Sequence, residues 1–376
     1  MGVDDGVVTL RWRLAADEAG LPDALFPDES LVERHVGTGE YRGLEFLQVN
    51  ARRIINHVPA ASRMPFRHTV NAYRGCSHAC TYCFARPSHA YLGLDTGEDF
   101  DRRIVVKINA VERMTAELRA PAWAGETVAM GTNTDPYQKA EGRYHLTRGI
   151  IGVLSEAANP FSILTKSTLI LRDLDVLGGA ARRTTVRANF SIGTLDRDVW
   201  RLTEPGTPPP DKRIEAVRRL NEAGIPCGVL IAPVLPGLSD GTEDLRAVVE
   251  ACVTAGAVSV SAIALHLRPG VREHYLGWLA GARPDLVRLH EQRFEGRAGP
   301  RAYQPKAVQA ELSERIGRLV RAAHPRPGGP ATRFVDTAAD DVTGRLHEQG
   351  FGGPARRTGG DAPGPAGSDE QLVLGL

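Results

Sequence analysis

The sequence predicts an α/β protein whose core is a partial (β/α)6 barrel of the TIM type, and two observations lead to that fold class. β-Branched runs alternate regularly with amphipathic stretches between Phe66 and Leu267, which is how consecutive βα units read. Six such units are present in that region. Parallel strands with helical crossovers allow an open doubly wound sheet, a full eight-unit barrel or a partial barrel, and six units favour the last.

The first half of the barrel is predicted from five segments. Residues 67–73 (RHTVNAY) form the first strand. Apolar residues three and four positions apart predict a helix over 104–120. A second strand over 126–132 precedes a helix over 147–159, and the third strand covers 161–167.

The second half repeats the same alternation. A helix over 171–183 leads to a fourth strand over 186–192. The fourth helix, 209–224, has proline at its start and glycine at its end, as helix boundaries often do. A fifth strand follows over 226–234, and a helix and strand over 242–265 complete the sixth unit.

The segments outside the barrel differ from it in composition. Residues 1–65 mix short apolar stretches with turn formers and are predicted to be an N-terminal cap on the barrel core of 66–267. Residues 268–324 carry helical patterns and are predicted as a C-terminal helical extension. Gly, Pro, Ala and Arg dominate 325–370, which predicts a disordered linker. An apolar motif returns at 371–376.

Charge and hydropathy exclude several classes of protein. Lys and Arg total 46 against 45 acidic residues, so the net charge of +1 produces no global field for nucleic acid or membrane. No run of about 18 apolar residues is present to cross a bilayer, and the start of the chain lacks the order of a secretory signal. We therefore expect a cytoplasmic protein with no membrane partner.

Three of the five cysteines stand together directly after the first predicted strand, with C-x3-C-x2-C spacing: Cys76, Cys80 and Cys83. Such clustering is unlike a disulfide framework. The loop after a barrel strand is where barrels hold their chemistry. Three closely spaced thiolates can bind three irons of a cubane cluster and leave the fourth iron without a protein ligand.

Zinc and a purely structural cluster are the alternatives for this loop. Zinc usually takes four protein ligands in a structural site, and His78 or His89 is available as a fourth. An electron-transfer cluster usually has four cysteines. The remaining two, Cys227 and Cys252, fall in a predicted strand and a predicted helix, where core cysteines are expected.

The aromatic residue Tyr82 directly precedes the last cysteine, and with it the motif resembles that of radical S-adenosylmethionine (SAM) enzymes. The resemblance implies a [4Fe-4S] cluster on the three cysteines whose free iron chelates the amino and carboxylate groups of SAM. One electron then splits a carbon–sulfur bond and yields a 5'-deoxyadenosyl radical. The family's barrel is also a partial (β/α)6 barrel, and the resemblance implies a reductant such as flavodoxin or ferredoxin.

The resemblance further suggests the SAM contacts beyond Tyr82. A polar segment after the second strand is expected at the methionine amino group, Lys166 at the SAM carboxylate, Ser191 at the ribose and Pro233 near the adenine. An ordinary βα turn and a surface lysine are the alternatives for the first two. The residues of the polar segment are Gly131, Thr132, Asn133, Thr134 and Asp135.

The segments CxxxCxYCFA, GTNTDPYQ, LTKS, SIGTLD, EPGTP and APVLPGLSD together resemble the spore photoproduct lyase-like group over residues 66–267. In that group the lyase repairs a thymine dimer in DNA and returns hydrogen through a cysteine just past the second strand. Residues 130–138 contain no cysteine here. We therefore expect a relative with the same radical generator and a different substrate, with nucleic acid as the leading candidate. Tyr137 is a candidate hydrogen donor, although packing is the favoured role.

The carboxyl-terminal hexapeptide resembles the motif by which bacterial repair and replication proteins bind the DNA sliding clamp. Packing of an apolar tail on its own barrel is the alternative. A competing hypothesis for the whole chain is a DNA-associated iron–sulfur or zinc protein, recruited by this tail and without radical catalysis. The residues that match the clamp motif are Gln371, Leu372, Leu374 and Leu376.

Overall fold

The computed structural model describes residues 31–59, 64, 66–297 and 299–323. The predicted disorder of 325–370 and the predicted clamp motif at 371–376 lie outside these residues.

Within the described residues, the main sheet has seven strands in the order β11-β10-β9-β8-β7-β4-β3. Six of them pair in parallel from β4 to β11, and β3 (Ile55–His57) adds an antiparallel strand at the β4 edge. These parallel strands confirm the predicted partial barrel. They are β4 (His68–Val70), β7 (Val128–Met130), β8 (Phe161–Thr165), β9 (Val186–Ser191), β10 (Cys227–Val234) and β11 (Val260–Ala264).

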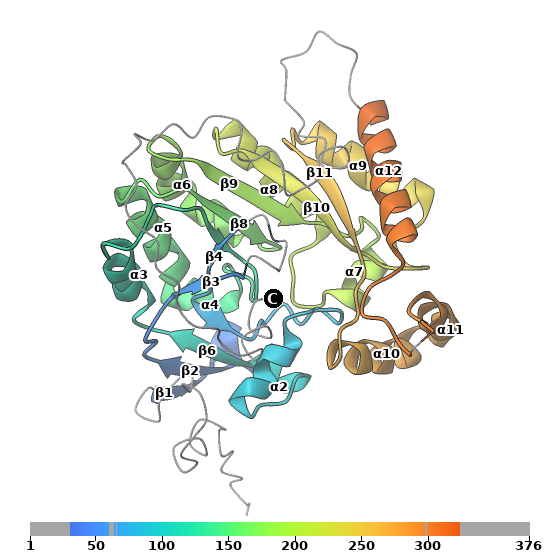
Figure 1. The fold of residues 1–376 in the computed structure, drawn as a ribbon, viewed down its shortest axis with the longest axis horizontal. Helices are drawn as coiled ribbons and strands as arrows, with labels where there is room; N and C mark the ends of the chain where they lie inside the picture. Colours follow the sequence, from blue (N-terminus) through green and yellow to red (C-terminus); the bar gives the residue numbers. More distant parts are fainter. Residues whose placement is uncertain (1–30, 60–63, 65, 298, 324–376) are drawn as a thin grey trace, which may run out of the picture.

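The crossover helices form a layer along one side of this curved sheet (Figure 1). A short 3-10 helix, η5 (Thr168–Asp173), follows β8. The helices of the layer are α3 (Ala110–Leu118), α5 (Leu146–Glu156), α6 (Leu174–Ala181), α8 (Pro210–Glu222) and α9 (Thr242–Thr254), while α4 (Lys139–Tyr144) and α7 (Arg197–Thr203) are short additions. Within the layer, α3 contacts α5, α5 contacts α6, and α8 contacts α9, while η5 contacts both α6 and α8.

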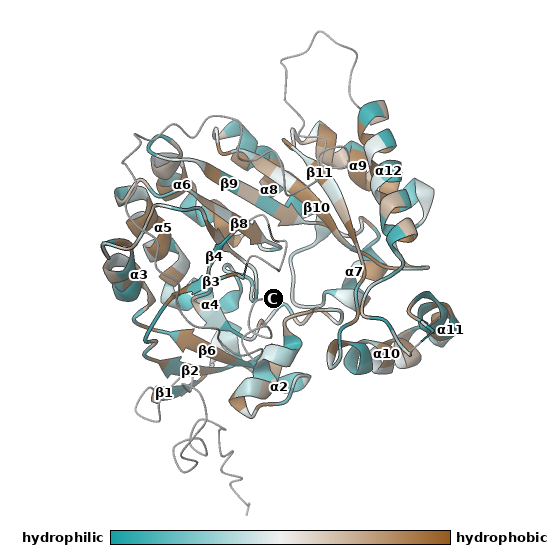
Figure 2. Ribbon diagram, in the orientation of Figure 1, coloured by the Kyte–Doolittle hydropathy of each residue, from teal (hydrophilic) through white to brown (hydrophobic). Residues whose placement is uncertain are grey.

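The strands form because their sequences suit a surface that is covered on both faces. In β10, Val229 and Ile231 are buried and the intervening Leu230 is partly buried, as in the near-continuous apolar strands of parallel sheets. Apolar residues gather along β8, β9, β10 and β11 in Figure 2. Cys227 and Cys252 are free and fully buried in this core, as predicted.

The helix predicted over 104–120 is wrong in its first part. Residues Arg103–Lys107 form strand β6, and α3 begins only at Ala110. The β-branched run of β6 is buried between β2 (Glu45–Val49) and β5 (Tyr73–Arg74), so pairing outweighs helical spacing. With β1 (Leu31–Val36) these strands form a second sheet, β1-β2-β6-β5.

The predicted C-terminal helices are present. Helix α12 (Lys306–Ala323) packs against β11 and α9 through a stripe of buried residues that includes Leu312 and Ile316. Helices α10 (Val271–Ala282) and α11 (Pro284–Arg293) contact each other. In the part of the chain that the structure describes, no helix combines the length and apolarity needed to span a membrane. The predicted domain boundaries stay a prediction.

Candidate functional site

The cysteine loop begins directly after β5, the edge strand of the second sheet. Gly75 opens it with φ +76°, and a Cβ there would lie 2.9 Å from the Phe100 carbonyl oxygen, so only glycine fits. The Cys76 amide donates to the same oxygen at 2.8 Å. Phe100 belongs to α2 (Glu98–Arg102), which precedes β6. The start of the loop is therefore fixed against α2, next to the second sheet.

The three thiols are close enough to affect one another. Cys76 and Cys80 are each 7% exposed, and Cys83 is less buried. Burial raises the pKa of Cys80 well above the usual value, and it raises the pKa of Cys83 to about 11, with the neighbouring Cys76 adding to both shifts. Among the described residues, no three His, Cys, Asp or Glu side chains converge as ligands of one metal ion would. A cubane cluster makes a different demand, because each thiolate binds its own iron.

A fully buried arginine, Arg86, supports the backbone of the cysteine loop through hydrogen bonds. Arg86 is 1% exposed and donates to the Cys80 carbonyl oxygen from Nε at 3.2 Å and from Nη2 at 3.0 Å. Its Nη2 also binds Asp101 at 2.9 Å, and its guanidinium lies 5.1 Å from the Phe100 ring centroid. Burial raises the pKa of Asp101 to about 6 although Arg86 opposes that shift. This bracing sets the position of the Cys80 backbone.

The polar segment after β7 holds the loop from the barrel side. Thr134 Oγ1 donates to the Gly75 carbonyl oxygen at 2.6 Å, and Gln138 Nε2 donates to the same oxygen at 2.9 Å. In addition, the Ser77 amide donates a hydrogen bond to Gln138 Oε1 at 3.0 Å. Gly131 permits the close approach to β8, because a Cβ there would lie 2.0 Å from the Leu164 carbonyl oxygen and its φ is +89°.

Asp135 links this segment to the cysteine loop and to β8. Its carboxylate lies 3.3 Å from His78 Nδ1 and accepts from Thr165 Oγ1 and from the Lys166 amide, both at 2.7 Å. Burial lowers the pKa of His78, but Asp135 and Cys76 outweigh burial and raise it to about 10. The Asp135 side chain is thus occupied within the protein. In the same segment, Thr132 Oγ1 and the Asn133 amide both bond to the Asn71 side chain.

A buried charged network lies beside the loop, and Glu204 is at its centre. The Glu204 carboxylate accepts from the Tyr82 hydroxyl and lies 2.9 Å from Lys166 Nζ and 2.5 Å from Arg213 Nη2. Burial would raise the pKa of Glu204, but Arg213, Lys166 and the hydroxyl lower it well below its usual range. Two cations against one carboxylate leave the network with a net charge of +1.

Lys166 connects the network to the neighbouring strand ends. Its Nζ donates to Ser191 Oγ at 2.6 Å and to the Ala232 carbonyl oxygen at 3.4 Å, and it lies 5.5 Å from the Tyr82 ring centroid. Ser191 Oγ donates to the same Ala232 oxygen at 2.7 Å. The bond between Ala232 and Pro233 is cis. The structure therefore brings Tyr82, Lys166, Ser191 and the peptide bond before Pro233 together, and their contacts with SAM stay a prediction.

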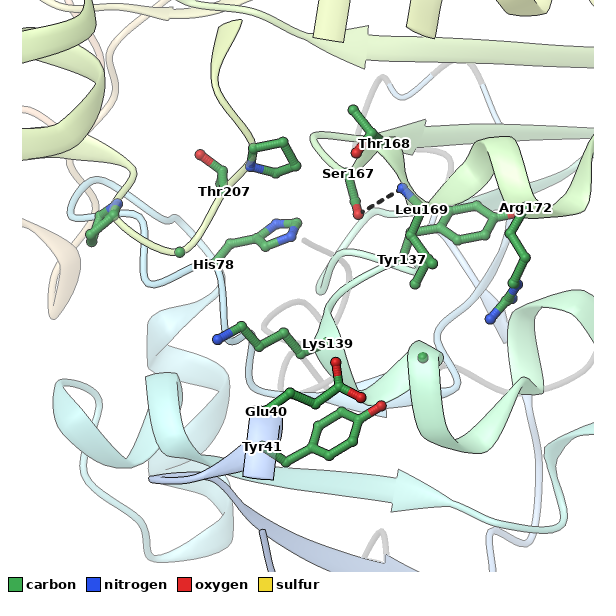
Figure 3. A pocket seen from close by; sticks show the side chains of 14 residues that line it. Glu40, Tyr41, His78, Tyr137, Lys139, Ser167, Thr168, Leu169, Arg172 and Thr207 are labelled. Carbon is green, nitrogen blue, oxygen red and sulfur yellow. Dashed lines mark hydrogen bonds between the residues drawn. The ribbon is translucent and has the colours of Figure 1, made fainter. Parts of the chain in front are cut away.

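A cavity of about 730 Å³ opens beside His78 of the loop. Figure 3 shows His78 and Lys139 on neighbouring sides of it. Tyr137 also lines the cavity but is only 1% exposed, and burial raises its hydroxyl pKa well above the usual value, with Asp173 adding to the shift. Its role as hydrogen donor stays a prediction. The cavity lining is Glu40, Tyr41, His78, Tyr137, Lys139, Gly142, Ser167, Thr168, Leu169, Arg172 and residues 205–208.

Sequence reasoning missed the residues that pair with or brace the predicted ones. Three of these residues have polar side chains that are fully buried, namely Arg86, Gln138 and Arg213. Glu204 forms an ion pair with Lys166. A signal was present for Glu204, because a lysine that closes an apolar strand needs a carboxylate nearby. The candidate zinc ligand His89 is bound elsewhere, with Nε2 3.0 Å from the Arg103 carbonyl oxygen, and burial lowers its pKa to about 4.

Comparisons of sequence identify the group to which these features correspond. The profile of the radical SAM superfamily matches residues 70–250. An uncharacterised protein of Mycobacterium bovis is 43% identical over 332 residues, which cover 86% of this chain and 96% of that relative. An uncharacterised protein of Methanocaldococcus jannaschii is 29% identical over 199 residues, which cover 52% of this chain and 70% of that relative.

Comparisons of structure point the same way. A spore photoproduct lyase mutant with dinucleoside spore photoproduct superposes with a TM-score of 0.57 and 17% identity, covering 82% of this chain and 89% of that one. Another mutant, with bound SAM and dinucleoside spore photoproduct, gives a TM-score of 0.56 and 18% identity, covering 74% and 80%. At such identities the likeness shows the fold.

Proposed function

Because this chain belongs to the radical SAM superfamily, we propose that it binds a [4Fe-4S] cluster through Cys76, Cys80 and Cys83 and reductively cleaves SAM. The donor set supports the proposal, since three neighbouring thiols on one braced loop match a cluster with one open iron. When bound, such a cluster supplies the electron that breaks a carbon–sulfur bond of SAM.

The residues of this chain would orient SAM through the charged network. Lys166 is the accessible cation, because its side chain is 14% exposed whereas that of Arg213 is 1% exposed. The 3.4 Å contact of Lys166 Nζ with the Ala232 carbonyl oxygen is the longest of its three hydrogen bonds. A SAM carboxylate would therefore replace that carbonyl oxygen as the acceptor. Glu204 holds the ammonium in place while the net charge of +1 favours an anion. The segment of Gly131 to Asp135 offers backbone groups to the SAM amino group.

For the substrate we propose a nucleic acid, held in the cavity beside His78. Lys139 is an exposed cation of the cavity lining, which also includes the carboxylate of Glu40. His78 and Arg172 belong to the lining as well, but they already face Asp135 and the pair Glu141 and Asp173. Phosphate groups suit an exposed cation such as Lys139. The absence of cysteine from residues 130–138 argues that the reaction differs from that of the lyase group.

Reductive SAM cleavage tests the proposed generator. Anaerobic reconstitution with iron and sulfide, followed by dithionite and SAM, is expected to yield 5'-deoxyadenosine and a reduced-cluster EPR spectrum that shifts when SAM is added. If the protein takes up no iron, or if SAM does not change the EPR spectrum of the cluster, the proposal is wrong. The competing function, a DNA-associated iron–sulfur or zinc protein without radical catalysis, would then be favoured.

Oligonucleotide binding tests the proposed substrate class. Lys139 is exposed at the rim of the cavity, and Lys139→Glu is expected to weaken binding of a short fluorescent single-stranded DNA by about tenfold at low salt, since it reverses one phosphate contact. Fluorescence anisotropy measures the change. Arg182→Glu, the same reversal at the end of α6, is the control and is expected to bind like the parent. If the parent protein, Lys139→Glu and Arg182→Glu bind the DNA with equal affinity, the proposal that nucleic acid binds in this cavity is wrong.

A further inference from the structure

An exposed aromatic and basic surface lies where β11 leads into α10 and where α11 leads into α12. We call it the Tyr303 surface, and it consists of His266, Arg268, Arg301, Tyr303 and Lys306. Tyr303 is 46% exposed, and its hydroxyl accepts from Arg268 Nη2 at 2.6 Å and from Nε at 3.1 Å. The Arg268 guanidinium also lies 5.7 Å from the Tyr303 ring centroid. The large ring is thus held in a fixed position at the surface rather than buried.

A contact chain of rings connects this surface with the cysteine loop. Tyr303 stacks on His266 with ring centroids 5.4 Å apart and an interplanar angle of 23°, and His266 lies 5.9 Å from Phe84. Phe84 directly follows Cys83, the least buried of the three cysteines. A β-bridge between His266 and Tyr303 and a 2.7 Å hydrogen bond from the Leu267 amide to the Ala302 carbonyl oxygen hold the two segments together. Three rings therefore span the distance from a proposed cluster ligand to solvent.

The Tyr303 surface is positively charged. The five residues that define it include three arginine or lysine residues and no aspartate or glutamate. This contrasts with the whole chain, in which charges balance to +1. Local fields of this kind steer partners of opposite charge. The three cations are Arg268, Arg301 and Lys306.

The cysteine loop faces three different surroundings, and the Tyr303 surface meets only one of them. His78 faces the cavity, Tyr82 faces the Glu204 network, and Phe84 faces His266. No residue of the Tyr303 surface lines the cavity. The three contacting rings therefore lead from the surface to the cysteine loop and not to the cavity proposed for the substrate.

We propose that the Tyr303 surface is the docking site of an acidic one-electron donor protein. The inference rests on the proposed function, because it assigns a route to the cluster that the three cysteines would hold. The donor loses one electron and the cluster gains it, with no bond made or broken and no proton transferred. Electron tunnelling falls steeply with distance, so a donor seated on Tyr303 gains from the short path through His266 and Phe84.

Charge reversal at the rim of the surface tests the docking site. The Arg301→Glu, Lys306→Glu double variant changes two exposed side chains. The control double variant, Arg119→Glu with Arg182→Glu, makes the same charge change at the far ends of α3 and α6, which lead into the amino ends of β7 and β9. Both proteins are reconstituted with iron and sulfide, and binding of oxidised flavodoxin is measured by calorimetry without SAM. Stopped-flow absorbance then gives the rate of cluster reduction by reduced flavodoxin and by dithionite.

The surface double variant is expected to bind flavodoxin about tenfold more weakly at low salt and to be reduced by it correspondingly more slowly. The difference should shrink at high salt, while reduction by dithionite stays unchanged. The control double variant should match the parent protein. Tyr303→Ala, which removes the outer ring and leaves the charges, should slow reduction by flavodoxin more than it weakens binding.

Three results would overturn the docking site: parental flavodoxin binding by the surface double variant, an equal loss in the control, or a selective loss of short single-stranded DNA binding. The last would assign the surface to nucleic acid. Failure of the proposed function has a separate signature, because the parent protein would then make no 5'-deoxyadenosine with dithionite whatever its affinity for flavodoxin.

Discussion

The Cys83→Ala protein is expected to lose its iron–sulfur cluster and SAM cleavage together. Cys83 is the least buried of the three loop cysteines, so alanine there removes a ligand with little damage to packing. Two thiolates cannot hold three corners of a cubane. We expect 5'-deoxyadenosine formation to fall by more than about a hundredfold, because even the outer partners of metal ligands are worth about 10–100-fold. Iron and sulfide analysis and the dithionite assay measure the loss.

The matched control removes a thiol that the fold uses only for packing. Cys252 is fully buried in α9, and Cys252→Ala is expected to keep iron content and SAM cleavage while costing about 1 kcal/mol of unfolding free energy through the small cavity it leaves. A Cys83→Ala protein that still makes 5'-deoxyadenosine would disprove the ligand assignment. So would a Cys252→Ala protein that folds but takes up no iron.

The barrel was predictable because its signals are local and repeated. Each strand of the main sheet is a short apolar run followed by a helical pattern, and the structure has all six parallel strands where the sequence placed them. The prediction failed at Arg103–Lys107, where a strand runs directly into α3. Its partner β2 lies more than fifty residues earlier, and a window read along the chain contains no information about that pairing.

The candidate site divides in the same way. Residues that stand in a motif or end a strand, such as Cys76 and Lys166, were predicted because the carboxyl ends of parallel strands meet at one edge. Glu204 and Arg213 were missed because their role arises only when Glu204, at the end of α7, meets both Lys166 after β8 and Arg213 in α8. The same applies to Arg86, whose contact with the Cys80 carbonyl shows only in three dimensions.

Glu204→Gln is expected to destabilise the protein strongly. The substitution keeps the side-chain shape and an acceptor for Tyr82 but removes the charge that Lys166 and Arg213 share. Breaking a buried ion pair by removing one partner costs about 3–5 kcal/mol, because an uncompensated charge stays buried. Urea unfolding at neutral pH measures the change. Glu243→Gln, which removes an exposed partner of Arg246, is the control and should cost less than about 0.5 kcal/mol.

A second substitution separates the electrostatic cause from loss of packing. Adding Lys166→Met to Glu204→Gln removes one of the two stranded cations, so the double variant should regain at least about 1 kcal/mol of the unfolding free energy. The recovered protein should nevertheless bind SAM poorly, because Lys166 is the accessible cation proposed for the SAM carboxylate. A double variant that is less stable than Glu204→Gln alone would show that Lys166 stabilises the site through its bonds to Ser191 and Ala232 rather than through Glu204. If the double variant binds SAM like the parent, the proposed contact between Lys166 and SAM is wrong, whereas the proposed cluster ligands are not affected by that result.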